Sequence, residues 1–181
     1  MSILFLNWNC GSPPNQGSRL GPLVLATDSL VYRFELAPTS DSSWVLRTRA
    51  RPGTPYFRDF RIPYPVYRLE VGDLDRDRRP DLLLGVEKTT PYDPIFRRRL
   101  FIYELRGNRF HTVWEGSRLV HPLVDFRLHT ESPTPEVYSM EYEKNGLYLI
   151  ARYQLGNFGL EFVDYVARNL DSLQAAKMLS P

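Results

Sequence analysis

The chain has 181 residues, of which 43% are hydrophobic and 13% aromatic, and it contains 15 prolines and 11 glycines. This composition is typical of one folded domain, residues 1–181, with a substantial core and many turns, and it excludes a disordered tail. The formal net charge of +2 gives no overall field that would favour a nucleic acid or an acidic membrane surface as partner.

The N-terminal segment MSILFLNWNCG starts with apolar residues but lacks the basic region and the long apolar run of a secretory signal. We therefore predict no signal peptide in this chain. The single cysteine, Cys10, excludes a disulfide framework and any zinc or iron–sulfur site built from several cysteines. No run approaches the ~18 consecutive apolar residues of a membrane-spanning helix, so we expect no membrane association.

Short alternating segments follow along the chain and predict strands, whereas helical periodicity is almost absent. The clearest internal match sets LVYRFEL and SSWVL, in the first third of the chain, beside LFIYELRGN and TVWEG. Each pair is an alternating strand, a polar turn and a strand that carries Trp44 or Trp114. Extension of this match predicts three units, at about 1–50, 64–116 and 121–167, with strands at 3–8, 22–26, 30–36, 44–49, 66–72, 81–86, 99–105, 110–115, 123–128, 136–142, 147–155 and 160–166.

The predicted fold is all-β, with repeated four-stranded antiparallel units like the blades of a β-propeller and a tryptophan in the fourth strand of the first two. Propellers close with about four to eight blades, so three would close tightly or dimerise into a six-bladed ring. A β-sandwich or an open barrel built from hairpins is the alternative. A short C-terminal helix is expected at about 169–179, capped by Asp171 or Ser172 and packed over an edge or a blade face.

The segment VGDLDRDRRPDLLLG places aspartates at relative positions 1, 3, 5 and 9, between an alternating strand and a buried one. A hard cation such as calcium takes six to eight oxygen ligands, and a turn that offers alternate side chains can wrap one ion. The predicted ligands are the carboxylates of Asp73, Asp75, Asp77 and Asp81, with the backbone carbonyl of Arg79 at position 7.

GDLDRDRRPDLLLG resembles the DxDxDGxxDLxxG loop of FG-GAP and VCBS (integrin-type) propeller repeats. The resemblance implies a loop that joins the first two strands of a blade, binds a structural calcium ion, and belongs to a protein of extracellular or periplasmic setting. The sequence departs from that pattern at Arg78, where the family usually has a glycine with positive φ, and Arg76, Arg78 and Arg79 add positive charge. The alternative is a turn without metal, in which the aspartates accept backbone N–H groups and pair with the arginines.

Two segments, 50–67 and 87–99, are longer than a hairpin needs and combine arginines with aromatic residues, which are enriched at recognition sites. In a propeller we expect both on the face opposite the aspartate loop. The predicted partner-facing residues are Tyr56, Phe57, Arg58, Arg61, Tyr92, Arg97 and Arg98. The alternative is that the aromatics fill the junctions between blades and that the arginines are solvated surface. The run 97–99 is too short and isolated to favour nucleic acid.

No motif of an enzyme is present, and the three histidines lie far apart in sequence without metal-ligand spacing. The preferred interpretation is a non-enzymatic binding or assembly module that recognises a protein or glycan. The alternative is a small carbohydrate-active hydrolase whose carboxylate pair would come from Glu104, Glu115, Asp125 or Glu141.

Overall fold

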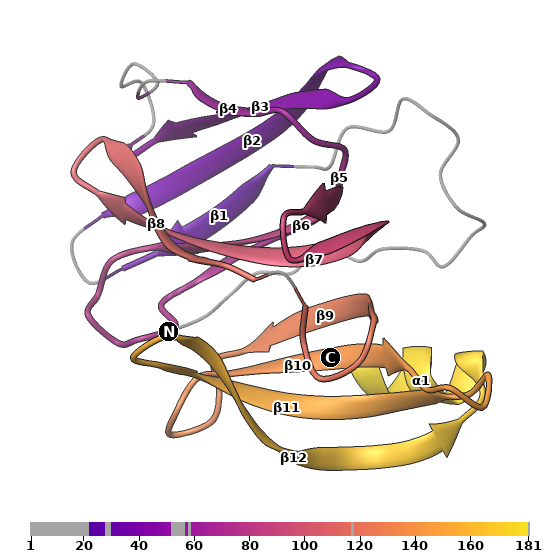
Figure 1. Ribbon diagram of the computed structural model, residues 1–181. Coiled ribbons are helices and arrows are strands. Elements are labelled where there is room, and N and C mark those ends of the chain that lie inside the picture. The colour runs from indigo at the N-terminus through magenta and orange to yellow at the C-terminus, as the bar shows by residue number, and fades with distance from the viewer. Residues whose placement is uncertain (1–21, 28–29, 52–56, 58, 117, 181) are drawn as a thin grey trace.

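The structure is a computed structural model that describes residues 22–27, 30–51, 57, 59–116 and 118–180. Its strands form three four-stranded antiparallel sheets, and in each sheet the spatial order of the strands follows the order along the chain. Figure 1 shows the sheets stacked one above another from the N-terminal to the C-terminal side. The prediction of an all-β fold of three repeated four-stranded, blade-like units and a short C-terminal helix is therefore confirmed.

The first sheet differs from the prediction in how its four strands are chosen. Its strands are β1 (Leu23–Ala26), β2 (Val31–Ser40), β3 (Ser43–Arg49) and β4 (Phe60–Ile62). The strand expected at 3–8 lies outside the described residues. The fourth strand is β4, which the sequence did not reveal because three residues among prolines and aromatics show no alternation. Trp44 consequently lies in the third strand of its sheet and not in the fourth.

The second and third sheets follow the predicted strand order closely. The second consists of β5 (Val66–Gly72), β6 (Asp81–Thr90), β7 (Asp93–Arg106) and β8 (Arg109–Glu115). The third consists of β9 (Leu123–His129), β10 (Glu136–Tyr142), β11 (Tyr148–Gly156) and β12 (Gly159–Leu170). The main difference is that β6 and β7 extend well beyond the expected ends at 86 and 99, so that they form one long hairpin.

The second sheet is buried on both faces, which explains the nearly continuous apolar run of β6. Leu82, Leu84 and Val86 face the core shared with the first sheet. Leu83, between them, faces the core shared with the third sheet. A strand covered on both sides has no solvent face, and therefore shows no alternation between apolar and polar residues.

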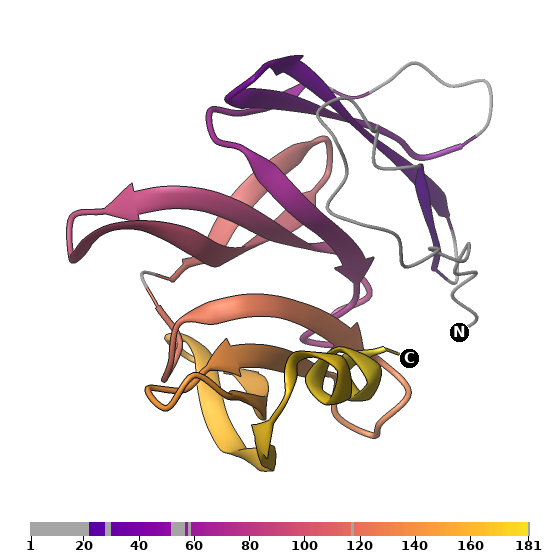
Figure 2. The same ribbon diagram turned by 90° about the vertical axis from the view of Figure 1, so that its right-hand side faces the viewer.

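The outer face of the third sheet is covered by α1 (Ser172–Leu179). Met140 and Ile150 of the sheet pack with Ala175 and Leu179 of the helix in a third, smaller core. Figure 2 shows α1 lying against this sheet. Asp171 caps the helix in a capping box with Gln174, as the sequence predicted for one of two residues. Within the described ranges, no helix is long and apolar enough to cross a membrane.

The first strands of the sheets lie side by side, β1 against β5 and β5 against β9. Arg68 on β5 makes a bidentate ion pair with Asp125 on β9, with Nη2 at 2.5 Å from Oδ2. Glu70 accepts the Leu128 N–H at 2.6 Å. At Gly72, an added Cβ would lie 2.4 Å from the Leu128 side chain, so glycine is needed where β5 approaches β9. The aspartate loop starts directly after this contact.

Candidate metal centre

The aspartate loop connects β5 to β6, the first two strands of the second sheet, as predicted. Leu74 anchors it, because this side chain is buried in the core between the second and third sheets. The carboxylate of Asp81, at the start of β6, accepts the N–H of Leu74 at 2.7 Å. The Arg76 guanidinium donates to the Ser132 carbonyl at 2.9 Å, in the connection between β9 and β10. The loop is thus held at both ends and against the next sheet.

Three aspartates fold the loop by accepting backbone N–H groups within it. Asp73 Oδ2 accepts the N–H of Arg78 at 3.1 Å, and Asp75 Oδ1 accepts the N–H of Asp77 at 3.1 Å. Asp77 Oδ1 accepts the N–H of Arg79 at 2.8 Å. These bonds are the local turns that aspartate side chains favour, and they leave the second oxygen of each carboxylate for other partners.

The loop also requires left-handed backbone at two non-glycine residues. Arg76 has a φ of 64° and Arg78 a φ of 67°. The second of these is the position where the FG-GAP pattern has glycine, and the arginine there adopts the left-handed backbone that glycine favours. A residue with a Cβ in this region costs about 1 kcal/mol or more.

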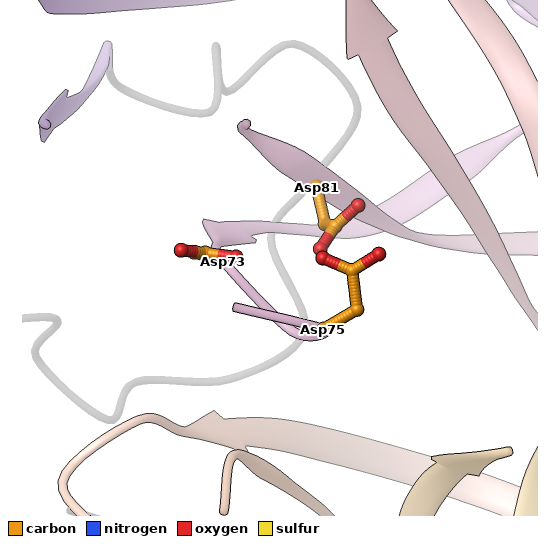
Figure 3. Close-up of side chains that lie close together, drawn as sticks. All are labelled: Asp73, Asp75 and Asp81. Atoms are coloured by element: carbon orange, nitrogen blue, oxygen red, sulfur yellow. The ribbon is translucent and has the colours of Figure 1, made fainter. Parts of the chain in front are cut away.

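Asp73, Asp75 and Asp81 bring three carboxylates together. One oxygen from each lies within 4.8 Å of the others. In Figure 3 the carboxylates of Asp75 and Asp81 lie next to each other, and the carboxylate of Asp73 lies to their left. Asp73 Oδ1 is buried and has no hydrogen-bond partner within the described part of the chain. A buried carboxylate oxygen without a donor is costly unless a cation satisfies it.

The electrostatics of the three residues favour a bound cation, because the three carboxylates are crowded together and partly desolvated. Burial, together with the neighbouring carboxylates, raises the pKa of Asp81 to about 7. Burial likewise raises the pKa values of Asp73 and Asp75, although both accept backbone hydrogen bonds that act in the opposite direction. Bringing like charges together in a desolvated loop disfavours their ionised forms.

Asp77 behaves differently, because the structure pairs it with Arg79 and leaves it outside the group of three. Burial alone would raise the pKa of Asp77, but the N–H and guanidinium of Arg79 outweigh this and hold it below its usual range. The same guanidinium contacts Glu104 on β7. The loop therefore combines both alternatives that the sequence left open, a carboxylate cluster at three positions and an arginine-paired turn at the fourth.

The donor set fits calcium. Hard carboxylate oxygens at positions 1, 3 and 9 are the type of ligand that calcium takes, and no thiolate or imidazole lies among them. Asp73, Asp75 and Asp81 would hold the ion, and it would neutralise the loop and fix the connection between β5 and β6. No family model matches the chain, and comparisons with curated proteins and with solved structures likewise find no match.

The described members of the predicted partner-facing set lie at different places in the structure. Tyr56 and Arg58 lie outside the described residues. Phe57 is half-buried against the core between the first two sheets, and Arg61 is exposed on β4. The neighbouring Asp59 and Phe60 line a small hollow with residues 108–110, at the turn from β7 to β8. This turn lies at the opposite end of β7 from Tyr92. At the other end of the first segment, Tyr64 lies beside the second segment, with Lys88 Nζ 3.9 Å from the centroid of its ring.

The other three predicted partner residues belong to the β6–β7 hairpin. Tyr92 is 90% exposed at its tip. Arg98 instead lies over the Tyr67 ring, with its guanidinium carbon 4.5 Å from the ring centroid, and donates to the Val124 carbonyl at 2.6 Å. These contacts use the Arg98 side chain to join the second and third sheets. Arg97 is half-buried and lies 3.4 Å from Asp93.

Sequence reasoning missed what makes this hairpin unusual. Ile95 and Phe96, beside Tyr92, are 57% and 62% exposed. Beneath them the fully buried Arg99 donates to Asp93 Oδ2 at 2.8 Å and to the Ile95 carbonyl at 2.9 Å. Figure 2 shows the hairpin extending beyond the rest of its sheet. The available signal was an apolar pair, Ile95 and Phe96, between Pro94 and the run of arginines at 97–99. The predicted partner-facing set took Tyr92, Arg97 and Arg98 from this segment and left that pair out.

The carboxylates considered for a hydrolase each have a structural partner. Glu104 pairs with Arg79 and Arg106, and Asp125 pairs with Arg68. Glu115 accepts the Tyr103 hydroxyl at 2.6 Å. Glu141 is completely buried and accepts the Ser139 and Tyr153 hydroxyls at 2.6 and 2.7 Å. Such contacts orient side chains for packing between strands and sheets, and they give no support to the hydrolase alternative.

Proposed function

We propose that this chain is a non-enzymatic binding or assembly module of the FG-GAP type, stabilised by one calcium ion in the loop between β5 and β6. The observation that carries the proposal is the approach of three carboxylate oxygens within 4.8 Å, with the buried Asp73 Oδ1 lacking a donor in the part of the chain that the structure describes. The ion has a structural role, because the loop offers no nucleophile beside its aspartates and the ion would fix the connection between two strands, β5 and β6.

The partner-binding element is the tip of the β6–β7 hairpin, where Tyr92, Ile95 and Phe96 are exposed. The buried contact of Arg99 with Asp93 holds this tip in place. Rigid aromatic and aliphatic side chains bind well because little conformational entropy is lost when they are covered. Of the two partner classes that the sequence allowed, a protein fits this tip better than a glycan. Ile95 and Phe96 offer no hydrogen bonds to sugar hydroxyls, whereas they fit an apolar cleft.

A single strand links the two sites. β6 starts at Asp81 in the loop and ends at Thr90, two residues before Tyr92. Its middle residues lie in the two large cores. An ion that fixes the start of β6 therefore supports the strand that carries the hairpin, and a module of this design would present its tip most rigidly when calcium is bound.

Titration of calcium into the protein by isothermal calorimetry tests the proposal. We expect a one-to-one binding isotherm for the unaltered protein and its loss in Asp73→Asn and Asp81→Asn, because each change removes one charge from the ligand set. Asp59→Asn is the matched control, since Asp59 is an exposed aspartate outside the loop. Equal calcium binding by all four proteins would refute the site.

A further inference from the structure

Arg79 is the one arginine of the loop whose side chain contacts an aspartate of the predicted ligand set, among the contacts described for 73–81. Its guanidinium pairs with Asp77 through Nη2, while its N–H donates to the other oxygen of the same carboxylate at 2.8 Å. Asp77 is also the only one of the four aspartates that stays outside the carboxylate group. The one aspartate that pairs with a guanidinium is therefore also the one that does not join the other three carboxylates.

Glu104 explains why Arg79 lies where it does and why it can let Asp77 go. The Arg79 Nε contacts Glu104 Oε1, and the Glu104 side chain is almost completely buried. Arg106 holds the other oxygen of Glu104, with Nε at 2.7 Å and Nη2 at 2.6 Å. Among the residues that the structure describes, Glu104 thus has two cationic partners, whereas Asp77 has one. Separation of Arg79 from Asp77 leaves the guanidinium paired with Glu104, so no buried charge is left without a partner.

We infer that Arg79 is an internal counter-ion that competes with calcium for Asp77 and thereby sets the calcium affinity of the loop. This inference rests on the proposed function. Without calcium, Arg79 neutralises Asp77 and holds it away from Asp73, Asp75 and Asp81. When calcium binds, Asp77 exchanges the guanidinium for the ion and becomes the fourth carboxylate ligand, while Arg79 stays on Glu104.

Arg79→Ala keeps the backbone carbonyl at position 7 but removes the guanidinium. We expect this variant to lose stability without calcium and to gain calcium affinity. In the presence of a chelator the variant should melt at a lower temperature, because Asp77 loses its counter-ion. In calcium it should bind more tightly, by about tenfold or more, because no ion pair must open and a nearby positive charge is gone. A role limited to folding would give the first effect without the second.

Arg78→Asn is the matched control. It removes one positive charge from the same loop, and no ion pair of the Arg78 side chain is present among the described contacts. Asparagine tolerates the left-handed backbone at this position, where φ is 67°. We expect Arg78→Asn to raise the calcium affinity by only a few fold, which measures the general effect of loop charge.

Calorimetric titration of the unaltered protein, Arg79→Ala and Arg78→Asn with calcium, together with melting in chelator, separates the outcomes. Tighter binding by Arg79→Ala than by Arg78→Asn supports the inference, even where the unaltered protein binds too weakly to measure. Equal affinities of the two variants, with measurable binding in the unaltered protein, would overturn the inference and leave the calcium site in place. No binding by any of the three at millimolar calcium would overturn both the inference and the proposed function.

Discussion

At the scale of single residues, the carboxylates of the loop from Asp73 to Asp81 lie in different environments. Asp81 is buried among like charges, while Asp77 has a guanidinium of its own. The spacing of the aspartates predicted that Asp73, Asp75 and Asp81 meet, but it also placed Asp77 among them, and the structure leaves Asp77 outside the group. The spacing could not predict the pairing of Arg79, since that depends on Glu104, which β7 brings to the loop from 25 positions along the chain.

Calcium binding should weaken as the solution becomes more acidic. Burial raises the pKa of Asp81 to about 7 in the folded protein without the ion, against 3.8 for an ordinary aspartate. The folded state therefore holds this proton to higher pH than the unfolded chain, so the stability of the chelated protein falls as pH rises between these values. Calcium must displace the proton, and its apparent affinity should fall by about tenfold per pH unit well below pH 7. Calorimetry at about pH 8, 7 and 6 measures this dependence. A calcium affinity that does not change across that range would contradict it.

Arg78→Gly should stabilise the protein. Arginine at a φ of 67° carries a steric cost that glycine avoids, offset in part by the greater freedom of glycine in the unfolded chain. We expect a gain of about 0.5–1 kcal/mol in the free energy of unfolding, measured by urea denaturation. Arg47→Gly, at a strand position on β3, is the control and should destabilise. A loss of stability in Arg78→Gly would show that the arginine side chain contributes more than its backbone conformation costs.

At the scale of elements, alternation predicted β5 and β10 with their observed bounds, although β5 lies at the edge of its sheet and β10 lies inside. It failed where tertiary contacts override local signals. Pro91 and Pro94 mark a loop by sequence, yet Arg99 folds that stretch into the end of a hairpin by donating to the Lys88 and Ile95 carbonyls. The three residues of β4 gave no periodic signal at all.

Substitution of the exposed apolar side chains at the tip of the β6–β7 hairpin should leave the stability nearly unchanged, whereas substitution of the buried Arg99 should lower it. Ile95→Ser together with Phe96→Ser changes exposed side chains outside the cores, so the free energy of unfolding should change by less than about 1 kcal/mol. Arg99→Ala removes a buried guanidinium that donates to the Asp93 carboxylate and to the Asp93 and Ile95 carbonyls, and it should lower the melting temperature clearly. Thermal melts of both variants test this. An Arg99→Ala variant that melts at the same temperature as the unaltered protein would show that the hairpin does not depend on the Arg99 contacts.

At the scale of the whole molecule, three blade-like sheets are stacked and the stack ends in a helix. The composition predicted one folded domain, and the repeated strand pattern predicted the sheets. What covers the last sheet was left open, because a short amphipathic segment fits an edge as well as a face. In the structure, α1 covers the face of the third sheet on which a further blade would stack. A ring completed by a second copy through that face would require the helix to move.

The helix should therefore act as an end cap for the stack. Leu179→Ala should cost about 2–3 kcal/mol, because Leu179 is buried against the third sheet, whereas Leu173→Ala, at an 81% exposed position, should cost less than about 0.5 kcal/mol. Urea denaturation measures both. Removal of residues 171–181 should expose Met140 and Ile150 and cause self-association, visible by analytical ultracentrifugation. A truncated protein that stays monomeric would contradict the role of α1 as a cap.

The most direct test of the central claim is thermal unfolding of the full chain in excess calcium and in chelator, beside the Asp73→Asn variant. A ligand that binds only the folded state stabilises it by about 2.7 kcal/mol at a concentration 100 times its dissociation constant. We predict a calcium-dependent rise in the melting temperature of the unaltered protein and none in Asp73→Asn. Identical melting temperatures in millimolar calcium and in chelator would contradict the calcium site and leave the loop as an arginine-paired turn.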